Sequence, residues 1–148
     1  MGLVRPSWDE LFIGVAHQLA TRATCDRAHV GCVLTVDRRI VSAGYNGSLP
    51  GMPHCDEVGH LMHESHCVRT IHAERNAVAD AARRGVSVAG ATAYVTITPC
   101  VVCLQLLVAS GVERIVSAGR YWDDEISLQL LAGSSVKVEV IGGADDAG

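Results

Sequence analysis

The stretches HAE at residues 72–74 and PCVVC at residues 99–103 decide how this chain is organised. They supply one imidazole and two thiols, a set that suits a tetrahedral zinc ion: His72, Cys100 and Cys103. Three protein ligands leave a fourth position for water, which is typical of a catalytic zinc site and not of a structural one. Glu74 is not needed as a ligand, and a carboxylate there can carry the protons of that water. The two stretches therefore predict a catalytic zinc centre.

Both stretches lie at the start of a predicted helix. Residues 72–84 are rich in helix formers and end at Gly85, and an apolar helix over 100–110 follows Pro99. Two cysteines spaced three apart share one face of the first helical turn, where unpaired N–H groups favour thiolate over thiol. The alternative is a closed structural zinc site with a solvated Glu74, but such a site normally has four protein ligands.

The rest of the chain alternates between helical and β-rich patterns. Apolar spacing and the candidate N-cap Ser7 predict a first helix, and the turn Asp37-Arg38 between two β-rich stretches predicts a hairpin. The predicted elements in order are a helix at 8–22, strands at 29–36 and 39–44, a loop at 46–71, a helix at 72–84, a strand at 91–98, a helix at 100–110, a strand at 113–117, a helix at 124–132 and a strand at 136–141. This order predicts an α/β fold, a three-layer α-β-α sandwich around a five-stranded mixed sheet.

Length and composition indicate one well-packed domain. A chain of 148 residues corresponds to about one domain, which we expect at 1–141, followed by an acidic, glycine-rich tail at 142–148 that we expect to be disordered. Hydrophobic residues make up 49% of the chain, and the mean hydropathy is +0.25. Such an apolar excess often lies in subunit interfaces, so we expect a homo-oligomer.

Charge and cysteine content limit which binding partners and which cellular compartment we expect. A net charge of −4 and an isoelectric point near 5.9 argue against nucleic-acid binding. We find no apolar stretch that approaches a membrane span, and no basic and apolar leader typical of a signal peptide. Six cysteines, at least two of them assigned to zinc, fit a reducing compartment better than a disulfide framework. We therefore expect a cytoplasmic protein without nucleic-acid or membrane partners.

The two zinc-ligand stretches together form the H-x-E and P-C-x-x-C signature of zinc-dependent nucleobase deaminases. Further motifs that carry a family resemblance lie at 5–9, 30–33, 44–47, 69–77 and 90–96. On these motifs the chain resembles the deoxycytidylate (dCMP) deaminases, within the cytidine/deoxycytidylate deaminase superfamily. The zinc signature alone also fits guanine, tRNA adenosine and riboflavin-pathway deaminases. The sequence Gly44-Tyr45-Asn46-Gly47, with a Cys/His-rich stretch before the HAE motif, indicates the dCMP branch.

The resemblance implies hydrolytic deamination of dCMP to dUMP and ammonia. Glu74 would take a proton from the zinc-activated water, pass it to ring N3 of cytosine and then protonate the departing amine. Ala73 would contact the substrate, and Asn46 would hydrogen-bond the deoxyribose. The alternative for Asn46 is a turn residue that tolerates left-handed geometry.

A nucleotide substrate also needs a phosphate ligand. An arginine fork suits phosphate, and the candidates near the predicted site are Arg22, Arg27 and Arg69. We favour Arg27, with the hydroxyl of Thr24 beside it. The alternative for each arginine is a solvated surface charge.

The cysteines outside the catalytic motif predict a second, structural zinc. A long irregular loop needs something to order it, and a closed zinc site with four ligands does so. The preferred ligands are Cys25, Cys55, His60 and Cys67, with His66 or His63 as the alternative histidine. Free thiols and exposed histidines are the alternative to this site. Cys32, between Gly31 and Val33 in a predicted strand, is expected to be a buried apolar residue.

The resemblance further implies a hexamer activated by dCTP and inhibited by dTTP. The effector would bind near the Gly-Tyr-Asn-Gly loop, at Tyr45, Asn46 and Gly47.

Three other functions are open: a deaminase of the same fold for guanine, cytidine or a tRNA adenosine; a non-catalytic zinc-binding module; and a thioredoxin-like redox pair at Cys100 and Cys103. An intact Glu74 argues against the second, and His72 with Glu74 argues against the third.

Overall fold

The computed structural model describes residues 4–120 and 124–141, so the predicted tail at 142–148 lies outside the described residues. The chain begins with helix α1 (Trp8–Ala20), and Ser7 is its N-cap as predicted. The hydroxyl of Ser7 accepts a hydrogen bond from the backbone N–H of Glu10 at 3.1 Å, and the Glu10 carboxylate accepts one from the Ser7 N–H at 3.3 Å. This reciprocal pair satisfies two N–H groups at the helix start and fixes its position.

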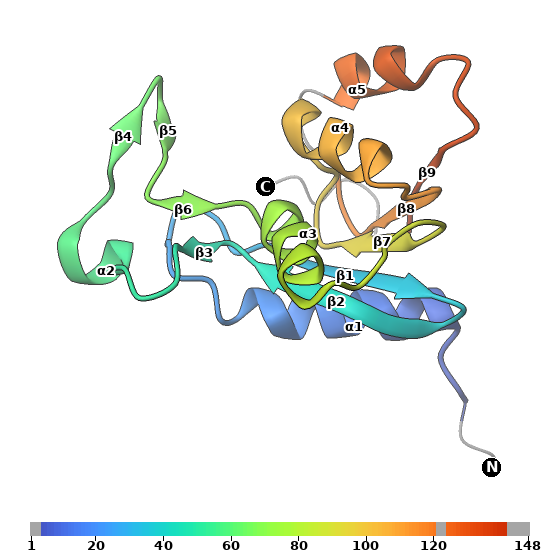
Figure 1. The fold of residues 1–148 in the computed structure, drawn as a ribbon, viewed down its shortest axis with the longest axis horizontal. Coiled ribbons are helices and arrows are strands. Elements are labelled where there is room, and N and C mark those ends of the chain that lie inside the picture. Colours follow the sequence, from blue (N-terminus) through green and yellow to red (C-terminus); the bar gives the residue numbers. More distant parts are fainter. Residues whose placement is uncertain (1–3, 121–123, 142–148) are drawn as a thin grey trace.

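The centre of the molecule is a five-stranded mixed sheet, as predicted (Figure 1). Its strands, in spatial order, are β2 (Arg39–Tyr45), β1 (Gly31–Val36), β7 (Thr92–Val95), β8 (Arg114–Ser117) and β9 (Lys137–Val140). The β1–β2 hairpin is antiparallel, and β1 is also antiparallel to β7. Strands β7, β8 and β9 are parallel. Asp37 and Arg38 both have positive φ, 51° and 60°, which suits the twist of a two-residue hairpin turn.

Helices cover both faces of the sheet and complete the three predicted layers (Figure 1). Successive side chains of a strand point to opposite faces, so Cys32 and Leu34 of β1 face one layer and Val33 faces the other. On one side lie α3 (Ala73–Arg84), α4 (Val101–Ala109) and α5 (Asp124–Leu131). Helix α1 lies on the other side, where Phe12 and Ala16 pack against Val33.

A close contact between β2 and α3 sets where α3 begins. A Cβ atom added to Gly44 would lie 2.6 Å from the carbonyl oxygen of Ala73 and 2.7 Å from the backbone nitrogen of Ala77. Both atoms belong to the backbone of α3, which cannot move aside without shifting the helix. Glycine at this position therefore allows the first turn of α3 to rest directly on the sheet.

Residues 46–71 are more ordered than the predicted loop. They contain β3 (Gly47–Ser48), α2 (Cys55–Val58), β4 (Met62–His63), β5 (His66–Cys67) and β6 (Thr70–Ile71). Strands β3 and β6 pair with each other, and β4 and β5 form a small hairpin that projects from the body of the molecule (Figure 1). Each element has two to four residues, too few to give a recognisable hydrophobic period.

Several predicted boundaries differ from the structure by a few residues. Helix α1 ends at Ala20 and not at residue 22, and β7 ends at Val95 and not at residue 98. His72 and Cys100 are the N-cap residues of α3 and α4, one position before the first helical residue. The two N-caps have extended backbones, so their side chains lie at the helix ends and not along a helix face.

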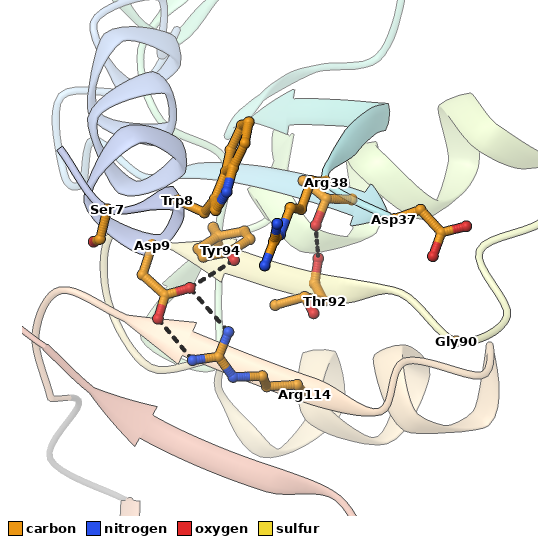
Figure 2. A pocket seen from close by; sticks show the side chains of 10 residues that line it. Ser7, Trp8, Asp9, Asp37, Arg38, Gly90, Thr92, Tyr94 and Arg114 are labelled. Carbon is orange, nitrogen blue, oxygen red and sulfur yellow. Dashed lines mark hydrogen bonds and ion pairs between the residues drawn. The ribbon is translucent and has the colours of Figure 1, made fainter. Parts of the chain in front are cut away.

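A polar network closes the sheet at the end where β7 and β8 begin (Figure 2). Arg114 of β8 bonds Asp9 of α1 at 2.7 Å and Glu139 of β9 at 2.8 Å, and Tyr94 donates to Asp9 at 2.8 Å. The network lines a pocket of about 390 Å³ whose rim carries Trp8. It joins one helix to three strands, at the end of the sheet opposite the predicted metal ligands.

Candidate active site and metal clusters

The structure brings the three predicted catalytic ligands together. The Nδ1 atom of His72 lies 3.3 Å from Cys103 Sγ and 3.5 Å from Cys100 Sγ. A tetrahedral zinc ion with ordinary bond lengths separates a nitrogen and a sulfur ligand by about 3.6 Å. The spacing of this cluster therefore fits a zinc ion, with three protein ligands.

The ligands also have the chemical character that zinc needs. Hydrogen bonding to Cys103 and to His72 lowers the pKa of Cys100 to about 3, which favours its thiolate, whereas the hydrogen bond to Cys100 and burial raise the pKa of Cys103. Cys103 is fully buried and Cys100 is half-buried. A thiolate in partly buried surroundings is costly without a cation, and a metal ion compensates that charge.

Glu74 lies in the first turn of α3, beside this cluster. Only 3% of its surface is exposed, and burial raises the pKa of its carboxyl above the usual value. A carboxyl in such surroundings binds and releases a proton more readily near neutral pH than an exposed one. Glu74 is also one of the residues that line the cleft described next.

A cleft of about 720 Å³ opens in front of the ligand cluster. Its lining includes three of the predicted substrate-binding residues: Arg27, Asn46 and Ala73. The fourth, Thr24, is not among the lining residues, and its hydroxyl accepts a hydrogen bond from the Ser48 N–H at 3.0 Å. Thr24 therefore ties β3 to the segment that follows α1.

Asn46 is buried and holds the segment before β1. Its Oδ1 accepts from the N–H of Val30 at 2.8 Å, and its Nδ2 donates to the carbonyl of Ala28 at 2.7 Å. Its backbone does not have a positive φ, so the alternative interpretation as a left-handed turn residue is wrong. The second hydrogen of Nδ2 is not used in these bonds and can serve a ligand in the cleft.

The structure distinguishes among the three arginines that could bind phosphate. Arg27 lines the cleft, whereas Arg22 and Arg69 do not. Arg69 donates instead to the carbonyl of Gly59 at 2.8 Å. Sequence reasoning missed a further cation, Arg75, which lines the cleft with a buried Nε that has no hydrogen-bond partner among the described residues. Its position directly after Glu74 was the available signal, because consecutive residues of a first helical turn both lie near the helix end.

The four predicted ligands of the second zinc also form a cluster. One atom from each of Cys25, Cys55, His60 and Cys67 lies within 4.8 Å of the others. The sulfurs of Cys55 and Cys67 are 3.5 Å apart, and Cys25 Sγ is 3.4 Å from His60 Nδ1. These separations fit the edges of a zinc tetrahedron, about 3.6–3.8 Å, and four ligands make a closed site.

Other predicted residues lie outside both clusters. The alternative histidines, His63 and His66, face each other across the β4–β5 hairpin and are exposed. Cys32 is fully buried in the sheet, as expected. Of the predicted effector residues, Tyr45 accepts a hydrogen bond from Asn76 through its carbonyl at 2.7 Å, and Gly47 pairs with Ile71 in the β3–β6 ladder.

Comparison with known proteins agrees with this geometry. Residues 6–118 match the family model described as "Cytidine and deoxycytidylate deaminase zinc-binding region". The chain belongs to this deaminase family. Both ligand clusters lie inside the matched region, and zinc is the metal that the family region binds.

Curated relatives of the chain include three with high coverage of its sequence. ComE operon protein 2 of Bacillus subtilis is 39% identical over 93% of this chain and 72% of its own length. The deoxycytidylate deaminase of Mycobacterium phage D29 is 39% identical over 76% of this chain and 94% of its own. The deoxycytidylate deaminase of Saccharomyces cerevisiae is 34% identical over 92% of this chain but only 45% of its own length.

A solved structure confirms the fold. The dCMP deaminase of cyanophage S-TIM5, in complex with dCMP and dUMP, superposes with a TM-score of 0.79 and 22% identity. The match covers 94% of this chain and all of the other. Among residues 4–120 and 124–141, no helix is both long enough and apolar enough to cross a membrane.

Proposed function

We propose that this deaminase converts dCMP to dUMP and ammonia by zinc-dependent hydrolysis. The observation that carries the proposal is the position of Glu74, a buried carboxyl in the same cleft as a three-ligand metal cluster. A purely structural zinc site has no use for such a carboxyl, since its ligand shell is closed. The names of the phage and yeast relatives support dCMP as the substrate.

His72, Cys100 and Cys103 would hold the zinc ion, which when bound lowers the pKa of a coordinated water toward neutrality. Glu74 accepts a proton from the attacking water and delivers it to ring N3 of cytosine. The water oxygen bonds to C4. Glu74 then takes the remaining proton from this new hydroxyl and passes it to the amine, so the C4–N bond breaks as the C4 carbonyl forms. One water is consumed, and one ammonia is released for each dUMP.

The walls of the cleft supply the contacts to the rest of the nucleotide. Arg27 and Arg75 are its arginines, and guanidinium groups bind phosphate through paired N–H donors. Asn46 presents its remaining amide hydrogen to the deoxyribose, while its other bonds keep residues 28–30 in place. Ala73 is completely buried, and its small side chain leaves room for the base next to the metal ligands.

The deciding experiment is an ultraviolet deamination assay with the purified, zinc-loaded protein. The panel contains dCMP, CMP, deoxycytidine and dCTP, with guanine and cytidine as substrates of other deaminases. We expect turnover of dCMP well above that of the nucleosides. Turnover of guanine or cytidine without dCMP would assign a different deaminase, and a zinc-loaded protein without any turnover would assign a non-catalytic module.

We also propose that the chain acts in the cytoplasm as a homo-oligomer, with a hexamer favoured, formed by a single domain over 1–141. Helix α4 is apolar except for Gln105 and leaves 59% of Val102 exposed, although such apolar helices are normally buried. Helix α5 exposes further apolar side chains nearby: Ile126, Leu128 and Leu130. Light scattering on the purified chain tests this; a monomer at micromolar concentration would contradict it.

Regulation by nucleotide triphosphates is the remaining part of this proposal. We expect dCTP to activate and dTTP to inhibit, through a site near Tyr45, Asn46 and Gly47. The support is the Gly-Tyr-Asn-Gly sequence, whose backbone connects β2 to β3 next to the cleft. A dCMP saturation curve that neither triphosphate changes would exclude this regulation.

A further inference from the structure

His60 of the second cluster has a partner on each of its ring nitrogens. Its Nδ1 lies 3.4 Å from the sulfur of Cys25, inside the cluster. Its Nε2 lies 3.0 Å from a carboxylate oxygen of Asp26, on the outside. The Asp26 side chain is 82% exposed, and it is the residue directly after a cysteine of the same cluster.

We propose that Asp26 is a positioning residue for the second zinc. A histidine that binds a metal through one nitrogen usually donates the N–H of its other nitrogen to a carboxylate or carbonyl. The carboxylate of Asp26 accepts from Nε2–H, so the hydrogen stays on Nε2 and the lone pair of Nδ1 points at the other three ligands. The same contact fixes the orientation of the ring.

A simple surface ion pair would explain the contact less well. An exposed aspartate and a charged histidine contribute little to stability, because water and salt screen the attraction. A charged imidazole also has hydrogens on both nitrogens and cannot bind a metal. Nδ1 points toward three cysteine sulfurs, two of them buried. This orientation is expected for a metal ligand, and an ion pair with Asp26 would not require it.

The position of Asp26 has a second consequence, which rests on the proposed dCMP deaminase activity. Residues 24–28 connect the second cluster to the cleft: Cys25 and Arg27 line it, and the carbonyl of Ala28 holds Asn46. The backbone N–H of Thr24 also bonds the carbonyl of Asn46 at 3.1 Å. Losing the metal would loosen the wall that contacts sugar and phosphate, so KM for dCMP should rise more than kcat falls.

The test measures zinc directly and does not depend on catalysis. In the His72→Ala background, which lacks a ligand of the catalytic cluster, the second cluster is expected to hold the remaining zinc. Asp26→Ala and Asp26→Asn are introduced there, and zinc release to a chromophoric chelator is followed after metal content and circular dichroism are measured. Asp56→Asn is the matched control, because it is an exposed acid directly after Cys55 and has no bond to His60.

We expect Asp26→Ala to release zinc about 10-fold to 100-fold faster than the control, the range typical for carboxylates that bind a metal-ligating histidine. Asp26→Asn keeps an acceptor oxygen without the charge and should fall between the two. Equal release rates for Asp26→Ala and Asp56→Asn would overturn the proposal, as would a background protein that binds no zinc. Because these readouts are independent of substrate, they remain decisive even if dCMP is not turned over.

Discussion

Glu74 carries the chemistry in the proposed reaction, and its substitution should separate catalysis from metal binding. Glu74→Gln keeps the size of the side chain but removes its ability to take a proton. We expect the rate of deamination to fall by at least about 10²–10⁴. The zinc content should stay the same, because Glu74 is not in the ligand cluster. Metal analysis beside single-turnover kinetics checks both; loss of zinc would make Glu74 a ligand instead.

The arginines of the cleft should recognise phosphate and not the base. Replacing Arg27 or Arg75 with alanine removes hydrogen bonds to a charged group, each worth about 1.5–3 kcal/mol. We therefore expect kcat/KM for dCMP to fall about 10-fold to 100-fold, with a much smaller change for deoxycytidine, which has no phosphate. Arg69→Ala is the control, since Arg69 does not line the cleft. Equal losses on both substrates would mean that the arginines act on the fold.

At the scale of residues, the sequence was most informative where chemistry demands rare side chains at fixed spacing. The HAE and PCVVC stretches specified the ligand cluster because a zinc ion accepts few other ligand sets. Arg75 was missed because a charged residue on a helix is usually solvated, and only the structure shows that its Nε is buried and that the residue lines the cleft. Asp26 was missed because its partner, His60, is distant in sequence.

The contact of β2 with α3 gives a prediction at the scale of elements. Gly44→Ala places a methyl group against the α3 backbone, and such overpacking costs about 1–3 kcal/mol of unfolding free energy. The displaced helix start carries His72 and Glu74, so zinc affinity should also fall. Urea unfolding and metal titration measure the two effects.

Gly14→Ala is the matched control for this prediction. Gly14 is inside α1, with no atom within 4 Å of an added Cβ. Alanine favours a helix over glycine by about 0.5–1 kcal/mol, so this variant should be more stable than the parent chain. A Gly44→Ala variant as stable as Gly14→Ala would contradict the close packing of β2 on α3.

Long elements with a clear hydrophobic period were predictable, and short ones were not. Helix α1 and the β1–β2 hairpin follow from local pattern and turn chemistry. The β3–β6 pair consists of two residues on each side, and its partners lie far apart in the sequence. Residues 46–71 contain this pairing and three of the four cluster residues, the fourth being Cys25, and neither feature produces a periodic pattern.

The network around Arg114 acts on the whole molecule, because it joins α1, β8 and β9. Its hydrogen bonds lower the pKa of both Asp9 and Glu139 below their usual values. A carboxyl with a lower pKa in the folded chain stabilises the fold above its unfolded pKa, about 3.9 for Asp and 4.3 for Glu. That stability is lost as pH falls through the folded values. We therefore expect steep acid destabilisation below about pH 5.

Arg114→Gln should flatten this acid dependence. Without the guanidinium, the two carboxyls return toward ordinary pKa values, so unfolding free energy changes less between pH 5 and pH 3. Urea midpoints across that interval measure the slope, with Arg39→Gln, a substitution of an exposed arginine at the start of β2, as the control. An unchanged slope in Arg114→Gln would show that other groups govern acid unfolding.

The sheet order was predictable only in part from the sequence. The pattern indicated five strands and a starting hairpin, and both are confirmed. It did not indicate that β1 would lie between β2 and β7. Which strand pairs with the second edge of β1 depends on packing between residues distant in the sequence. Arg114 shows the difficulty: it bonds Asp9, which is 105 positions away in the chain.

The pairing of Gly47 with Ile71 and of Ser48 with Thr70 has a consequence for how the family can vary in length. These two pairs hold the ends of the intervening stretch together. The stretch is therefore a closed loop whose two ends have fixed positions on the core. The entropic cost of closing such a loop grows only slowly with the number of residues in it. Insertions and deletions between residues 49 and 69 should therefore change the folding free energy of the core only slightly. A lineage could shorten this stretch and lose the second cluster while His72, Cys100 and Cys103 kept their positions, with the wall at residues 24–28 less firmly held.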